Sequence, residues 1–258
     1  MILKLKGVCR HFGGLLAVKD FDLNLEAGHI TGLIGPNGSG KTTLLNLISG
    51  FLKPNEGRII FEERPIQSLN AYEICELGIS RSFQTPQLFG DNTVLEKVMV
   101  GGHIKSRVGK LAACIGLPSA IEDNRRIKEL ALKLLRQSGI ADLRDAKAAS
   151  LPFGKKHLLE IARALACQPR LLLLDEPCGG LSHSESDEIC EFIVSLKKQG
   201  LTILMVEHNM PVIMGISDHL VVMNEGQKLF EGSPLAAQSD ERVISAYLGG
   251  SWRKLAHS

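Results

Sequence analysis

The chain has 258 residues, a formal net charge of +2 and an apolar fraction of 44%. These values are typical of one large globular domain, and the near-neutral charge gives no electrostatic reason to expect nucleic-acid binding. The longest apolar runs, such as LTILMV at 201–206, are far shorter than the roughly 20 residues that a membrane-spanning helix needs. Polar residues interrupt the apolar runs near the N-terminus, so we expect no signal peptide. The six cysteines lack CxxC spacing, which favours reduced thiols over a metal site.

The first part of the chain favours β-strands. Phe21, Leu23 and Leu25 alternate with polar residues, which is the period of a half-buried strand. The short apolar run ITGLIG has the character of a buried strand, and it leads into a glycine-rich turn. A helical stretch follows this turn and is predicted to end at Gly50. The elements predicted here are strands over 21–26, 30–35 and 58–63 and a helix over 41–49.

From about residue 88 to 150 the pattern is helical, with almost no strand signal. Ile127, Leu130, Ala131, Leu134 and Leu135 have the spacing of an amphipathic helix, which Gly139 is placed to end. Beyond 151, strands and helices alternate again, which predicts a parallel sheet with helices on its faces. The elements predicted there are a helix over 158–165, a strand over 170–174, a helix over 189–196 that stops at Gly200, and a strand over 201–206.

The stretch GPNGSGKT at 35–42 fits the phosphate-loop pattern G-x-x-x-x-G-K-[ST], and it lies between a predicted strand and a predicted helix. Its glycines allow a backbone curl whose N–H groups bind phosphate oxygens, and the helix N-terminus adds partial positive charge. Lys41 is expected to reach the β- and γ-phosphates, and Thr42 to offer its hydroxyl to Mg²⁺. The predicted ATP-binding residues of this loop are Gly35, Pro36, Asn37, Gly38, Ser39, Gly40, Lys41, Thr42 and Thr43.

Two acidic residues follow the apolar run LLLL at 171–174. A buried strand would carry Asp175 to its carboxyl end, where open α/β sheets bind ligands, and Asp175 would then hold the metal directly or through water. Glu176 would stand one residue further on as the general base that polarises the attacking water. The plainer alternative is an ordinary pair of acids in a loop, and the presence of the phosphate loop argues against it.

Several further motifs occur in a familiar order, and with them the chain resembles the ATP-binding subunits of ABC (ATP-binding cassette) transporters. They are RHFGG at 10–14, RSFQTPQLF at 81–89, LPFGK at 151–155, GGLSHSE at 179–185 and VEHNM at 206–210. The resemblance covers nearly the whole chain. It implies a P-loop NTPase fold of the α/β class: a core with a parallel sheet over 1–87 and 151–258, an N-terminal antiparallel β subdomain, and an inserted α-helical subdomain over 88–150, all forming one ATP-binding domain.

The resemblance also implies roles for single residues. Gln84 would sense Mg²⁺ and the γ-phosphate and couple them to the membrane partner, and His208 would contact the γ-phosphate and order the water. Phe12 would stack on adenine, with Val18 packed nearby. Each has a plainer alternative: Phe12 would otherwise be a core residue, and His208 a surface histidine at a strand end. The segment 179–185 would cross to a second ATPase subunit.

The segment LPFGKK departs from the family's LSGGQ pattern. Pro152 stands in place of serine and removes a donor worth about 0.5–1.5 kcal/mol, or about 1.5–3 kcal/mol toward a charged group. We hypothesise that Lys155 partly replaces this contact by charge. The alternative is that Lys155 and Lys156 are simply solvated. Pro152, Phe153, Gly154 and Lys155 are expected to face the ATP of the partner subunit, and we interpret the segment as a variant rather than an inactive site.

Three stretches narrow the resemblance to importers of branched-chain and other hydrophobic amino acids. They are 83–101, 213–234 and 243–250. This implies an ATP- and Mg²⁺-dependent ATPase that is peripheral to the cytoplasmic face of the inner membrane. Its partners would be a second ATPase subunit, identical or different, two transmembrane permease subunits and an extracytoplasmic solute-binding protein. Leu88 and Phe89 stand where the family docks a short helix of the membrane subunit, and the plainer alternative for them is ordinary packing. The alternatives are an exporter ATPase, for example for lipid extraction, and a regulatory subunit that hydrolyses ATP poorly. A soluble chromosome or translation ATPase is a rival from another class. It would need a long coiled coil between the phosphate loop and the LPFGKK segment, or two cassettes in one chain, and the sequence has neither.

Overall fold

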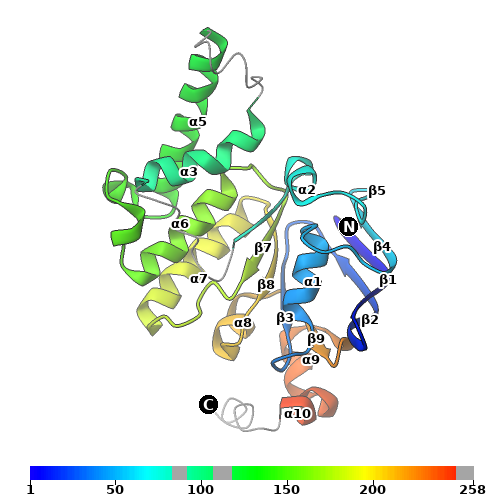
Figure 1. Cartoon of the computed structure of the whole chain (residues 1–258). Coiled ribbons are helices and arrows are strands. Elements are labelled where there is room, and N and C mark those ends of the chain that lie inside the picture. Colours follow the sequence, from blue (N-terminus) through cyan, green and yellow to red (C-terminus); the bar gives the residue numbers. More distant parts are fainter. Residues whose placement is uncertain (83–91, 107–117, 248–258) are drawn as a thin grey trace.

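The computed structural model describes residues 1–82, 92–106 and 118–247, and two β-sheets organise them (Figure 1). The smaller sheet is antiparallel, in the strand order β2-β1-β4-β5. The larger has the order β10-β9-β3-β8-β7-β6 and is parallel except for β10. The strands are β1 (Leu3–Phe12), β2 (Leu15–Leu25), β3 (Ile30–Ile34), β4 (Glu56–Phe61), β5 (Arg64–Pro65), β6 (Ile79–Arg81), β7 (Leu171–Asp175), β8 (Thr202–Val206), β9 (His219–Asn224) and β10 (Gln227–Gly232).

Helices separate most of the strands of the larger sheet, as a parallel sheet requires. The α-helices are α1 (Lys41–Ile48), α2 (Ala71–Leu77), α3 (Val94–Gly102), α5 (Pro118–Gln137), α6 (Phe153–Leu165), α7 (His183–Lys198), α8 (Met210–Ile216), α9 (Pro234–Ser239) and α10 (Glu241–Tyr247). Short 3-10 turns occur at His103–Lys105, Ala141–Leu143 and Ala148–Ser150. Figure 1 shows α3 and α5 on the side of the molecule opposite the antiparallel sheet.

The strands of the larger sheet are buried on both faces. In β7, Leu172 and Leu174 belong to the apolar cluster formed with α5, α6 and α7. Leu171 and Leu173 belong to the cluster formed with α1 and the antiparallel sheet. Because successive side chains of a strand point to opposite faces, an unbroken run of leucines fits only a position in the middle of the layers. This position brings Asp175 to the carboxyl end of a central strand.

The predicted elements agree with the structure apart from their ends. Phe21, Leu23 and Leu25 are fully buried on one face of β2. The strand predicted over 58–63 lies at Glu56–Phe61 instead, because Glu62 and Glu63 have φ values of 45° and 65° and form the turn into β5. The helix predicted from the 127–135 pattern is α5, and Gly139 follows it with a φ of 68°. The expected α/β fold with an antiparallel β subdomain is confirmed.

The elements found between β6 and β7 are helical. In the described part of this stretch they are α3, α5, α6 and the 3-10 turns. Ile127, Ala131 and Leu135 of α5 are buried, and α5 contacts both α3 and α6. Among the described residues, none of the helices is both long and apolar enough to cross a lipid bilayer.

Candidate functional site

The phosphate loop connects β3 to α1, and its path depends on glycine. Gly40 has a φ of 105°, and a Cβ atom there would lie 2.3 Å from the carbonyl oxygen of Ala17. A Cβ on Gly35 would lie 2.1 Å from the carbonyl oxygen of Met223. The loop therefore passes too close to β2 and β9 for side chains at these two positions. It delivers its backbone amides to the N-terminus of α1, where partial positive charge favours a phosphate group.

Lys41 is held over this loop by its own backbone. Its ammonium donates to the carbonyl oxygens of Gly35 and Pro36, at 2.8 and 2.9 Å. Burial lowers the pKa of Lys41, while the nearby carboxylates of Glu176 and Asp175 oppose that effect. An ammonium has three N–H donors, so these two bonds orient the group while it can still donate to a phosphate oxygen. Lys41 thus lies over the loop, and its contact with the β- and γ-phosphates stays a prediction.

Asp175 lies at the end of β7 in an ion pair that the sequence did not reveal. Its Oδ2 accepts from Nη2 of Arg81 at 2.7 Å, and both side chains are 5% exposed. Arg81 also donates from Nη1 to Oδ1 of Asn46 at 2.6 Å. The other oxygen of Asp175, Oδ1, is buried and has no hydrogen-bond partner among the residues that the structure describes. The Oδ2 atom therefore links β7 to β6 and, through Arg81, to α1. The Oδ1 atom can accept a further ligand.

Glu176 and His208 meet at the edge of the phosphate loop. The Nε2 atom of His208 lies 2.7 Å from Oε1 of Glu176. The pairing of β7 with β8 places the two loops side by side, and the N–H of Glu176 donates to the carbonyl oxygen of Val206 at 2.9 Å. Glu176 has a φ of 50°, a conformation that is uncommon for a residue with a side chain. The two groups that the sequence assigned to the attacking water are thus in contact.

A pocket of about 640 Å³ joins these groups, within the range typical of small-ligand sites. One wall is the phosphate loop together with Glu176 and His208. The hairpin between β1 and β2 and the turn between β9 and β10 form the rest of the lining. Its lining residues are Phe12, Leu15, Leu16, Ala17, Asn37, Gly38, Gly40, Lys41, Thr42, Thr43, Glu176, His208, Glu225 and Gly226.

The apolar wall agrees only partly with the prediction for adenine stacking. Phe12 lines the pocket and is 43% exposed, with the Arg10 guanidinium 4.7 Å from its ring centre. Val18 does not line the pocket, because it is fully buried in the core of the antiparallel sheet. The exposed side chains of Leu15 and Leu16 lie in the wall instead. The two glycines between β1 and β2 are the signal that could have revealed these leucines, since they mark a hairpin tip.

The turn between β9 and β10 is a second part of the site that sequence reasoning missed. Glu225 and Gly226 have φ values of 47° and 80°, as in a two-residue hairpin turn. The Gly226 N–H donates to the carbonyl oxygen of Ser39 at 3.0 Å, and its own carbonyl accepts from the N–H of Lys19 at 2.8 Å. This turn therefore joins the phosphate loop to β2 and fixes the width of the pocket.

The variant segment at 151–156 begins α6, with Pro152 as the residue before the helix. Gly154 is buried, and a Cβ there would lie 2.8 Å from Oε1 of Glu185. Hydrogen bonds from Ser182 and from the N–H of Gly154 lower the pKa of Glu185. Phe153 is 49% exposed, and its ring centre lies 4.8 Å from that of His157. The start of α6 thus packs against the loop at 179–185 and presents Phe153 to the outside.

Lys155 forms an ion pair within its own chain. Its ammonium contacts Oε1 of Glu188 on α7, and both side chains are partly exposed. Of the described residues, those that line the phosphate-loop pocket do not include any of Pro152–Lys155. This arrangement is compatible with a contact to the nucleotide of another subunit. Gln84, Leu88 and Phe89, which the sequence also singled out, lie outside the described residues.

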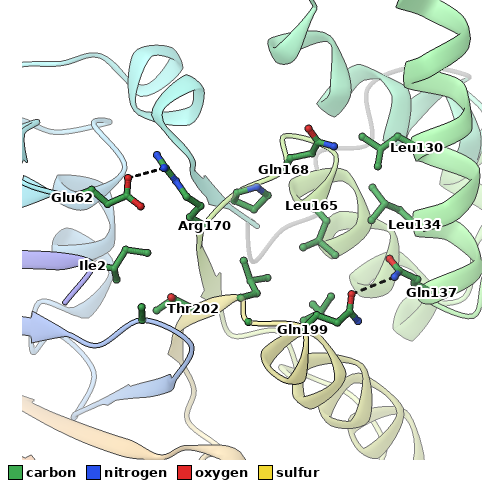
Figure 2. A pocket seen from close by; sticks show the side chains of 15 residues that line it. Ile2, Glu62, Leu130, Leu134, Gln137, Leu165, Gln168, Arg170, Gln199 and Thr202 are labelled. Atoms are coloured by element: carbon green, nitrogen blue, oxygen red, sulfur yellow. Dashed lines mark hydrogen bonds and ion pairs between the residues drawn. The ribbon is translucent and has the colours of Figure 1, made fainter.

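A second hollow, of about 440 Å³, lies at the amino ends of the strands (Figure 2). Thr202, the first residue of β8, lines it. Figure 2 shows Leu134 and Leu165 on one side and, on the other, an ion pair between Arg170 and Glu62 with a separation of 2.8 Å. Because α/β sheets bind nucleotides at the carboxyl ends of their strands, this hollow is not the nucleotide site.

Two family models match parts of this chain, and a known protein is similar to it over nearly its whole length. A family model for the ABC transporter matches residues 18–179, and one for the branched-chain amino acid ATP-binding cassette transporter matches residues 227–252. The high-affinity branched-chain amino acid transport ATP-binding protein BraF of Pseudomonas aeruginosa is 37% identical over 249 residues, which cover 96% of this chain and 98% of that protein.

Solved structures agree with these matches. A nucleotide-free ATP-binding cassette from an ABC transporter has a TM-score of 0.84 at 34% identity and covers 96% of this chain and 99% of its own. A dimeric cassette in a post-hydrolysis state, bound to ADP and Pi, has a TM-score of 0.76 at 26% identity and covers 90% of this chain and 99% of its own. The match over 18–179 includes the phosphate loop, Asp175 and Glu176. The chain therefore belongs to the ATP-binding subunits of ABC transporters, which hydrolyse ATP to power transport.

Proposed function

We propose that this chain is the ATPase subunit of an importer for branched-chain and related hydrophobic amino acids. The observation that carries the proposal is the match of residues 227–252 to the branched-chain cassette model, at the end of a chain that is 37% identical to BraF over nearly its full length. The catalytic motifs alone would suit an exporter or a regulatory subunit equally well. The C-terminal match favours import, and the contact between Glu176 and His208 favours an active enzyme over a poorly hydrolysing subunit.

In this proposal, different pocket residues bind the base and the phosphates of ATP and activate the attacking water. Phe12 and its neighbouring leucines bind the base, and the phosphate loop and Lys41 bind the phosphates. Glu176 accepts a proton from the attacking water, while His208 orients this water and contacts the γ-phosphate. The support for these roles is positional: Lys41, Glu176 and His208 all line the same pocket, and the contact of His208 Nε2 with Glu176 Oε1 holds the base beside the histidine.

The donor set suits a magnesium ion. Mg²⁺ prefers oxygen ligands, and bound with ATP it would neutralise charge that develops on the phosphates. Asp175 offers a buried Oδ1 atom without a partner in the described part of the chain. Thr42 offers a hydroxyl in the pocket, and Gln84 stays a predicted third contributor outside the described residues. Thr42 and Asp175 would hold the ion.

A second ATPase subunit completes the proposed enzyme, because the segment Pro152–Lys155 lies away from the pocket of its own chain. The buried Gly154 and the exposed Phe153 put backbone and an aromatic ring at the start of α6, where a nucleotide of the partner can approach. The similarity to a dimeric cassette supports this arrangement. Both an identical and a different partner are compatible with it.

The replacement Lys155→Gln tests whether the positive charge in the variant segment contributes to binding the partner subunit's ATP. If Lys155 leaves Glu188 to contact the partner's triphosphate, the variant is expected to need roughly tenfold more ATP for dimerisation, because one charged contact is lost. The measurement is ATP-driven dimerisation by size-exclusion chromatography, together with turnover. Lys156→Gln is the matched control, at the next position on the same helix. Unaltered dimerisation and turnover in Lys155→Gln would refute a contact between Lys155 and the partner's ATP, and Lys155 would then serve only its ion pair with Glu188.

The permease is proposed to dock in a groove of about 330 Å³ lined by parts of α2, α3 and α6. The large side chains of Phe51, Tyr72, Val100 and Ile104 line this groove and are 37–61% exposed. Exposed apolar side chains gathered around a groove suit a short amphipathic helix. Such a contact would place the chain on the cytoplasmic face of the inner membrane and couple it to two transmembrane subunits. We further propose that residues 88–150 act as a helical subdomain, which contributes Val100 and Ile104 to this surface.

The import proposal predicts a response to cargo. In liposomes that hold the complete transporter, ATP hydrolysis is expected to rise severalfold when the solute-binding protein carries leucine, because the loaded protein favours the state in which the ATPases close. The measurement is phosphate release with loaded and unloaded binding protein. The same binding protein with urea or a short amide is the control for cargo class. A rate that does not change with leucine but rises with the amide would overturn the cargo assignment and leave the ATPase assignment standing.

A further inference from the structure

Glu207 is a buried carboxylate beside the proposed hydrolytic pair. It follows the last residue of β8, immediately before His208, and is only 2% exposed. A buried carboxylate is stable only when hydrogen bonds or opposite charge satisfy it, so its partners show what it does. The sequence did not single it out, because a lone glutamate at a strand end is ordinarily a surface residue.

The partners of Glu207 are backbone N–H groups of two different loops. Its Oε1 accepts from the N–H of Cys178 at 2.7 Å. Its Oε2 accepts from the N–H groups of His208 and Asn209, at 2.9 and 3.3 Å. Hydrogen bonds from N–H groups to a carboxylate are stronger than neutral ones. Both oxygens of one carboxylate are thus used, one for each loop.

These two loops carry the two groups that meet at the phosphates. Cys178 is two residues after Glu176, within the turn that the N–H of Gly179 closes on the carbonyl oxygen of Glu176 at 3.0 Å. Glu176 itself has the uncommon positive φ of 50°, which needs support from its surroundings. On the other side, Glu207 holds the backbone of His208, whose ring lies 2.7 Å from Glu176.

We infer that Glu207 is a positioning residue that sets the separation of Glu176 and His208 by clamping the backbones of their loops. The inference rests on the hydrolytic roles proposed for these two residues. A glutamine at 207 would offer one acceptor oxygen, and its NH₂ group would face the N–H of one of the loops. The loops would then move apart, and small displacements of catalytic groups cost large factors in rate.

The test is the kinetics of Glu207→Gln in the full chain. We expect kcat for ATP hydrolysis to fall roughly ten- to a hundredfold, with the KM for ATP unchanged within about twofold, because the phosphate loop is not touched. In a His208→Ala background, Glu207→Gln should lower kcat much less than in the unaltered chain, since its effect runs through the separation of Glu176 and His208, which no longer matters once the histidine ring is absent. Thermal melting by circular dichroism checks that the variants fold.

Asp218→Asn is the matched control. The Asp218 carboxylate also accepts from a backbone N–H, that of Ile30 at 2.8 Å, but at the opposite ends of the strands. Its kcat should stay within about twofold of the unaltered chain. An unchanged kcat in Glu207→Gln would overturn the inference alone, as would equal losses with and without His208. Absence of hydrolysis by the unaltered chain would overturn the proposed roles of Glu176 and His208, and the inference with them.

Discussion

ATP hydrolysis by the Glu176→Gln variant is expected to fall roughly 10²- to 10⁴-fold, while ATP binding is retained. Glu176 contacts His208 at 2.7 Å and lines the same pocket as Lys41. An amide has nearly the size of a carboxylate but cannot accept the proton of the attacking water, so the variant keeps the shape of the site and loses its base. The measurement is phosphate release at saturating ATP, together with binding of a fluorescent ATP analogue.

The matched control for this prediction is Glu63→Gln. Glu63 shares the left-handed backbone of Glu176, with a φ of 65°, but it is exposed in the turn between β4 and β5. Its rate should stay within about twofold of the unaltered chain, as for most surface substitutions. Hydrolysis by the Glu176→Gln variant within tenfold of the unaltered chain would contradict the role of Glu176 as the base.

The parts of the site that local sequence determines could be predicted. The phosphate loop is contiguous, so Gly40 and Lys41 lie where the motif places them. The leucine run before Asp175 predicted a buried strand, and the structure has Asp175 at its carboxyl end. The alternation of Phe21, Leu23 and Leu25 predicted the buried face of β2 for the same reason, since a period of two is a local property.

The parts that depend on strand pairing could not be predicted. Arg81 and Asp175 are 94 positions apart and meet only because β6 pairs with β7. Glu207 reaches the loop after Glu176 only through the register of β7 against β8. Val18 points into the core because of the irregular register between β1 and β2, which no short window reveals. Contacts of this kind follow from the topology of the sheet and not from local patterns.

Removal of the arginine next to Asp175 is expected to destabilise the fold strongly. In Arg81→Met the Asp175 carboxylate, which is 5% exposed, would lose the cation 2.7 Å away. Breaking a buried ion pair from one side costs about 3–5 kcal/mol in the free energy of unfolding, because a buried charge is left uncompensated. The measurement is the midpoint of urea unfolding in the absence of nucleotide, with the unfolding monitored by two spectroscopic probes. Arg170→Met is the control, since Arg170 pairs with Glu62 at an exposed position and should cost less than about 1 kcal/mol.

A second substitution that restores charge balance distinguishes two causes of the lost stability: the unpaired charge and the lost packing. If the cost of Arg81→Met comes from the stranded charge, the double variant Arg81→Met with Asp175→Asn should recover most of the lost stability, because no buried charge remains. If it comes from lost packing around the guanidinium, the second change should recover nothing, and the ion pair would not be what stabilises this region. Stability and activity should then diverge in the double variant: it folds, but without the carboxylate it lacks the proposed ligand of the metal, so hydrolysis stays low while the urea midpoint returns. That divergence would show that one side chain serves the fold through Oδ2 and the reaction through Oδ1.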